Sequence, residues 1–125
     1  MKNNLAKIAQ QKKIKYFLIS FVDLFGIQRA KLVPARAISD MQKTGAGFGG
    51  FATYLDLDFA APDMFAVPDP ESLIQIPWQP DVGWLASDLV INKAPMDQCP
   101  RVILKKQINH MTDLNFKMMT GVECE

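Results

Sequence analysis

KYFLISFVDLFGIQRAKLV, residues 15–33, carries the strongest structural signal in the chain. Residues 15–24 are rich in aromatic and β-branched side chains, and residues 27–33 resume this character after Phe25 and Gly26. Two such runs around a short turn that contains glycine are typical of paired strands. The stretch therefore predicts a β-hairpin. Asp23 and Arg29 flank its turn, and we expect them to form a structural ion pair or hydrogen bond.

Three segments show the apolar periodicity of helices. Residues 4–13 carry apolar side chains at spacings of three and four, and so do residues 101–115. Residues 35–44 follow Pro34, which ends the preceding strand, and Gly45 is a suitable C-terminal stop. The sequence therefore predicts a helix in each segment.

Further strands are predicted between prolines and at the end of the sequence. They cover residues 65–67, 73–76 and 82–90, and a new strand is expected over residues 116–124. Residues 93–100 form a polar connection with two prolines, which is typical of a domain boundary. Several short strands with a few helices predict an α+β fold.

Composition indicates an ordinary globular protein. The 125 residues are 49% hydrophobic and 22% charged, with a formal net charge of +1. Such a balance gives no electrostatic reason to expect nucleic acid or an anionic membrane as a partner. The longest apolar stretches are far shorter than the roughly 20 residues that span a bilayer. No apolar segment follows Lys2, so we expect a cytoplasmic protein, with Cys99 and Cys124 as reduced, mainly structural thiols.

Glycines concentrate in residues 45–50, where they alternate with phenylalanine. Phe48 and Phe51 can hold such a loop in place while the glycines allow close approach of the backbone. No Gly-Lys-Ser/Thr sequence follows, so this is not a Walker phosphate-binding loop. Loops of this kind often carry function.

Six motifs stand in the order and spacing of one enzyme family. They are Phe21-Val22-Asp23-Leu24-Phe25-Gly26 with Arg29, the glycine and phenylalanine loop, Asp63-Met64 to Pro68-Asp69, Ile76-Pro77-Trp78, Pro100-Arg101 with Leu104, and Gly121-Val122-Glu123-Cys124-Glu125. In these motifs the chain resembles the front end of a glutamine synthetase, and it looks most like the branch of glutamate–methylamine ligases (γ-glutamylmethylamide synthetases). The resemblance implies an N-terminal helix (1–13), a β-grasp domain (14–97) and the truncated start of the catalytic domain (98–125).

Glu123 and Glu125 are the candidate metal ligands. At alternate positions of the expected strand they would share one face, about 7 Å apart at Cα. Carboxylate oxygens suit Mg²⁺ or Mn²⁺. Without the family, two acids on the solvated face of a terminal strand are the favoured interpretation; the resemblance reverses this and implies metal ligation in the complete protein.

By resemblance, the complete protein is an ATP-dependent carbon–nitrogen ligase. Its substrates are glutamate, ATP and an amine, which reacts with γ-glutamyl phosphate to give a γ-glutamyl amide. Family members form homo-oligomeric rings in which the loop matching residues 45–52 reaches the active site of a neighbouring subunit. The chain alone lacks most of the nucleotide and glutamate sites, and we expect it to be inactive. An alternative is a non-catalytic β-grasp module that docks on full-length subunits.

The loop departs from the family's pattern. Many ammonia-using members carry Asp-Gly-Ser-Ser where an ungapped count places Gly49, Gly50, Phe51 and Ala52. Without that aspartate the site loses its preference for compact ammonium, and Phe51 suits an amine with a methyl group, so we expect methylamine to be preferred. Two alternatives stay open. A gap could let Asp56 or Asp58 supply the acid and keep ammonia as the substrate, or the departure could mark a member that has lost amide synthesis.

Overall fold

The computed structural model describes residues 4–123, which form an α+β fold with a small mixed sheet, as the sequence predicts. In chain order the elements are α1 (Leu5–Lys12), β1 (Tyr16–Val22), β2 (Gln28–Pro34), the 3₁₀ turn η1 (Ala35–Ala37), α2 (Ile38–Thr44), β3 (Ala46–Phe48), η2 (Gly50–Ala52), β4 (Met64–Pro68), η3 (Pro70–Ser72), β5 (Ile74–Gln75), β6 (Val82–Ile91), β7 (Ala94–Pro95) and α3 (Pro100–Asp113).

The sheet is built around a parallel pair of strands at its centre. Its strand order is β2-β1-β6-β4-β3, with β5 and β7 paired to different parts of the long strand β6. Strands β1 and β6 run parallel, and the other pairs are antiparallel. The predicted hairpin is confirmed, because β1 and β2 pair directly and Phe21 stands opposite Arg29.

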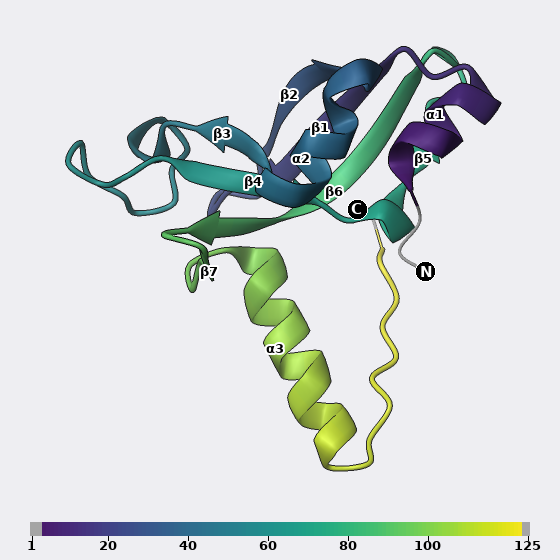
Figure 1. Ribbon diagram of the computed structural model, residues 1–125. Coiled ribbons are helices and arrows are strands. Elements are labelled where there is room, and N and C mark those ends of the chain that lie inside the picture. Colours follow the sequence, from purple (N-terminus) through teal and green to yellow (C-terminus); the bar gives the residue numbers. More distant parts are fainter. Residues whose placement is uncertain (1–3, 124–125) are drawn as a thin grey trace.

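The core lies between the sheet and the two N-terminal helices. Phe17 and Ile19 of β1 and Leu85 of β6 are fully buried, together with Leu5 of α1 and Ile38 of α2. Figure 1 shows α2 lying against the sheet and α1 near one end of it. Strand β1 supplies this core with its inward-facing aromatic and β-branched side chains, the composition from which the strand was predicted.

Helix α3 extends away from the sheet (Figure 1). It begins after Cys99 with Pro100 at its first position, where a missing N–H costs little. Cys99 is buried as a free thiol, and Val102 also belongs to the core. The buried apolar contact of α3 with the domain therefore lies in the first turn of the helix. Among the helices described between residues 4 and 123, none combines the length and hydropathy needed to cross a bilayer.

The strand expected over residues 116–124 is not formed in its described part, residues 116–123. This segment instead runs back alongside α3 without regular structure (Figure 1). A strand needs a neighbouring strand to pair its backbone N–H and C=O groups, and no described strand borders this segment. The prediction from composition was therefore wrong for residues 116–123, and Cys124 lies outside the described residues.

Candidate functional site

The glycine and phenylalanine segment is partly a strand and not only a loop. Residues Ala46–Phe48 form β3 and pair with β4, where Ala46 stands opposite Ala66. Gly45 ends α2 with φ 83°, and a Cβ there would lie 2.9 Å from Cβ of Phe65. A glycine is therefore required where the chain turns from helix to strand.

Gly49 and Gly50 lead into a tight turn. The 3₁₀ turn after them is closed by the amide of Thr53, which donates to the carbonyl of Gly50 over 3.1 Å, and by the Thr53 hydroxyl, which donates to the same oxygen over 2.5 Å. A Cβ on Gly50 would lie 2.5 Å from Cδ1 of Leu57, whereas on Gly49 the nearest atom is Cε1 of Phe51 at 3.3 Å. A side chain at Gly50 would thus require the Leu57 side chain to move, and one at Gly49 would require only a small movement of the Phe51 ring.

Phe51 presents an aromatic surface next to these glycines. Its side chain is half exposed and stacks on Phe59, with ring centroids 4.4 Å apart and planes at 17°. No carboxylate occurs between residues 46 and 54. The nearest acids in sequence are Asp56 and Asp58, both exposed, and Asp58 accepts a hydrogen bond from the amide of Ala60. Residues 46–54 therefore offer exposed aromatic surface and no carboxylate near Gly49.

The predicted contact between Asp23 and Arg29 is confirmed. Nε of Arg29 donates to Oδ2 of Asp23 over 2.9 Å, and the amides of Phe25 and Ile27 donate to Oδ1 over the same distance. Burial disfavours the charged carboxylate, but the hydrogen bonds from Ile27, Arg29 and Phe25 outweigh it and hold the pKa of Asp23 below its usual value. This buried ion pair organises the turn of the hairpin.

Glu123 is exposed in the irregular segment after α3. Glu125 lies outside the described residues, so the predicted side-by-side placement of the two carboxylates stays a prediction. Within residues 4–123 there is no group of three or more His, Cys, Asp or Glu side chains able to hold a metal ion. Glu123 fits a hard cation by chemistry alone, and further ligands must come from elsewhere.

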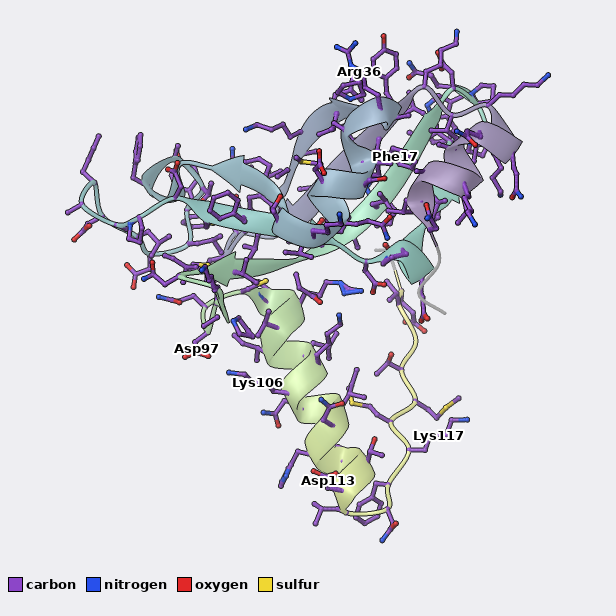
Figure 2. The ribbon with its side chains drawn as sticks, viewed as in Figure 1. Phe17, Arg36, Asp97, Lys106, Asp113 and Lys117 are labelled. Atoms are coloured by element: carbon purple, nitrogen blue, oxygen red, sulfur yellow. The ribbon has the colours of Figure 1, made fainter. Side chains whose placement is uncertain are left out.

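A second polar cluster joins α3 to the sheet. Arg101 contacts Asp69 over 2.5 Å and Asp88 over 3.2 Å, and Lys105 contacts Asp88 over 2.5 Å. Figure 2 shows α3 leaving the sheet with its side chains largely surrounded by open space. The cluster brings together Asp69 and Arg101, which belong to separate sequence motifs, and its charges compensate one another. Its role is to dock α3.

Lys31 contacts the candidate loop, Tyr54 lies at the end of this loop, and the sequence analysis missed both. Nζ of Lys31 donates to the carbonyl of Gly47, and the ring of Tyr54 lies under the guanidinium of Arg29. The strand periodicity offered a signal, because Lys31 lies two residues after Arg29 and shares its face of β2. No local pattern marks Tyr54, since its contacts depend on the tertiary fold.

No family model matches the chain. Curated relatives do. A glutamine synthetase from Rhizobium leguminosarum bv. phaseoli is 57% identical over 122 residues, 98% of this chain and 28% of the relative. A glutamate–methylamine ligase from Methyloversatilis universalis is 34% identical over 123 residues, 93% of this chain and 27% of the relative.

A solved structure, the GmaS/ADP complex in conformation 1, superimposes with a TM-score of 0.88 at 55% identity, covering 91% of this chain and 26% of the other. The relatives of the chain are ligases of the glutamine synthetase family. The chain belongs to the glutamine synthetase family and matches its N-terminal domain. It spans little more than a quarter of the length of the relatives that it matches.

Proposed function

We propose that the chain is part of an ATP-dependent glutamate–amine ligase, which forms a γ-glutamyl amide through γ-glutamyl phosphate. Support comes from the names of its relatives, glutamine synthetase and glutamate–methylamine ligase, and from its likeness to a protein solved with ADP. The proposed activity is that of a protein with the length of the relatives, of which this chain spans little more than a quarter. The 125 residues alone are inactive in this proposal, because electrostatic catalysis needs a complete and preorganised site.

Methylamine is the proposed amine substrate, and the composition of the candidate loop carries this choice. Gly49, Gly50 and Phe51 form an amine-site loop offered to a neighbouring subunit. The loop contains no carboxylate, and the stacked rings of Phe51 and Phe59 give it an apolar surface. Such a surface gives ammonium no counter-charge and accommodates a methyl group.

Ammonia is the second candidate, because the rhizobial relatives with more than half of their aligned residues identical are called glutamine synthetases. The exposed carboxylates of Asp56 and Asp58 follow the loop closely in sequence. In a ring of subunits, either one could supply the acid that the Gly49 position lacks. A direct comparison of the two amines is therefore the decisive measurement.

Glu123 and Glu125 are the proposed ligands for Mg²⁺ or Mn²⁺ in a cytoplasmic, homo-oligomeric ring. Both are hard oxygen donors, which fits these cations. The bound metal would neutralise charge on the phosphates during transfer. Glu123 is exposed and so is free to take part in such a site once other segments surround it.

The test is steady-state phosphate release by the full-length gene product with glutamate, ATP and Mg²⁺, with methylamine or ammonia varied. We expect a higher kcat/KM for methylamine. A higher kcat/KM for ammonia contradicts the choice of amine and leaves the ligase assignment intact, whereas no release with either amine contradicts the ligase assignment.

Gly49→Asp tests the position of the amine site. The backbone at Gly49 has φ −68°, which any residue adopts, and the added Cβ would lie 3.3 Å from Cε1 of Phe51, so the ring must move slightly. We expect the kcat/KM ratio to shift toward ammonia by about tenfold or more, equivalent to about 1.4 kcal/mol of differential transition-state binding. Gly49→Asn is the matched control, since it has the same size without the charge. An equal shift in both variants excludes an electrostatic role for this position.

A further inference from the structure

The hairpin of β1 and β2 contacts the candidate amine-site loop at both of its ends. We propose that Lys31 and Arg29, two side chains of β2, are positioning residues that hold residues 46–54 in the conformation that the amine site needs. The role in amine binding rests on the proposed function, whereas the contacts themselves do not.

Lys31 holds the first end of the loop. Its Nζ donates to the carbonyl of Gly47 and lies 4.9 Å from the centroid of the Phe48 ring. The edge of Phe48 also packs on Phe21, with centroids 5.0 Å apart and planes at 88°. The ammonium group therefore binds both a backbone oxygen and an aromatic face immediately before Gly49.

Arg29 holds the second end. Its guanidinium carbon lies 5.0 Å from the centroid of the Tyr54 ring, and its Nε is fixed by the buried Asp23 carboxylate. The amide of Leu24 donates to the carbonyl of Tyr54 over 3.4 Å, and the Phe25 ring packs edge-on against Tyr54 at 5.7 Å. The end of the loop is thus attached to the most rigid part of the hairpin.

The backbone conformation of Tyr54 needs stabilising contacts from outside the loop. Its backbone has φ 52°, a left-handed conformation that costs energy for a residue with a bulky side chain. Its side chain is more than half exposed, so core packing does not compensate for this cost. The contacts with Arg29, Leu24 and Phe25 are those that stabilise the conformation.

Between these two ends the loop depends on its own short-range bonds. The amide of Ala52 donates to the carbonyl of Gly49, and that of Thr53 to the carbonyl of Gly50. These bonds close the turn, while the pairing of β3 with β4 and the contact of the buried Thr53 hydroxyl with Sδ of Met64 tie it to one side of the sheet. Arg29 and Lys31 lie two residues apart on one strand and point to the same face, so β2 contacts the loop from one side at both ends. We infer that β2 and β4 together determine the direction in which Gly49 and Phe51 face.

The direct test is amide hydrogen exchange, which does not depend on catalysis. In the full-length protein, Lys31→Met should raise exchange rates in residues 46–54 at least threefold, because it keeps the apolar stem and removes the donor. Lys31→Arg should retain the wild-type rates. Lys7→Met is the control, since Lys7 is an exposed lysine of α1, which lies at the end of the sheet away from β3 (Figure 1). Exchange in β6 should stay unchanged in all three, which excludes general unfolding. Unchanged exchange in the loop of Lys31→Met overturns the proposal.

Kinetics then test the role in amine binding. We expect Lys31→Met and Arg29→Lys to raise KM for the amine at least fivefold while KM values for glutamate and ATP change less than twofold. Arg29→Lys keeps the charge next to Asp23 and removes the planar group above Tyr54. Altered exchange with an unchanged amine KM overturns the positioning role. If the wild-type protein lacks ligase activity, the proposed function fails, and the exchange experiment still decides whether these residues hold the loop.

Discussion

Arg29 pairs with Asp23 through a single 2.9 Å hydrogen bond from Nε, and the carboxylate that accepts it is buried while the guanidinium reaches the surface. The same carboxylate accepts the amides of Phe25 and Ile27. The turn between β1 and β2 is therefore closed around a negative charge. Because the loop before β4 rests on this hairpin, the ion pair connects the stability of the fold to the geometry of the candidate site.

Replacing Asp23 should change how stability depends on pH. Its pKa in the folded protein lies below the ordinary value of about 3.9. The carboxylate therefore contributes its full stabilisation above that value and loses it as the pH falls through the folded pKa. We expect Asp23→Asn to lower the urea midpoint at pH 7 and to flatten its decline between pH 5 and pH 2. Asp113→Asn, at an exposed position on α3, is the control. Equal pH profiles for Asp23→Asn and the wild type contradict the prediction.

Truncating the centre of the core should be costly. Leu85 of β6 is fully buried among residues of β1 and the helices. Leu85→Ala is expected to reduce the free energy of unfolding by about 2–5 kcal/mol, through lost burial and the cavity left behind. Leu32 is 55% exposed, and Leu32→Ala should stay within about 0.5 kcal/mol. Urea unfolding followed by circular dichroism measures both, and similar losses would mean that the two faces of the sheet are misassigned.

Even an alanine at position 45 should destabilise the protein. It combines φ 83° with a Cβ position 3.0 Å from the carbonyl oxygen of Ala66, so both backbone strain and a contact with backbone oppose a side chain. We expect Gly45→Ala to cost more than about 1 kcal/mol of unfolding free energy. Gly121→Ala, where a Cβ meets nothing within 4 Å, serves as the control in the same thermal unfolding experiment. Equal melting temperatures for the two variants are incompatible with the described turn.

The docking of α3 should depend on salt. Asp88 contacts Arg101 and Lys105 at the partly exposed junction of β6 and α3. Asp88→Asn is expected to cost up to about 1 kcal/mol at low ionic strength and less at 1 M NaCl, where charges are screened within about 3 Å. The amide hydrogen exchange rates of α3 should be higher in Asp88→Asn than in the wild type. Asp97→Asn breaks a largely exposed contact with Lys106 and should leave the exchange rates of α3 residues near Val102 unchanged.

Much of the fold could be predicted from the sequence because its signals are local. The hairpin, the three helices and strands β4, β5 and β6 all follow from apolar periodicity and from prolines and glycines at their ends. The ion pair across the hairpin turn was also predictable, because its partners are only six residues apart. The order of motifs likewise indicated the family, which the rhizobial relatives confirm.

The predictions from sequence failed where the structure of a segment depends on contacts with residues that are distant in the sequence. Residues 46–48 became a strand because β4 pairs with them, and residues 116–123 did not because no described strand borders them. The same holds for Lys31 and Tyr54, which meet the candidate loop only after the sheet has formed. Local periodicity thus determined which segments are helices and strands. Pairing and packing alone decided which edge each segment joins, since backbone hydrogen bonds and side-chain contacts between distant residues form only in the folded chain.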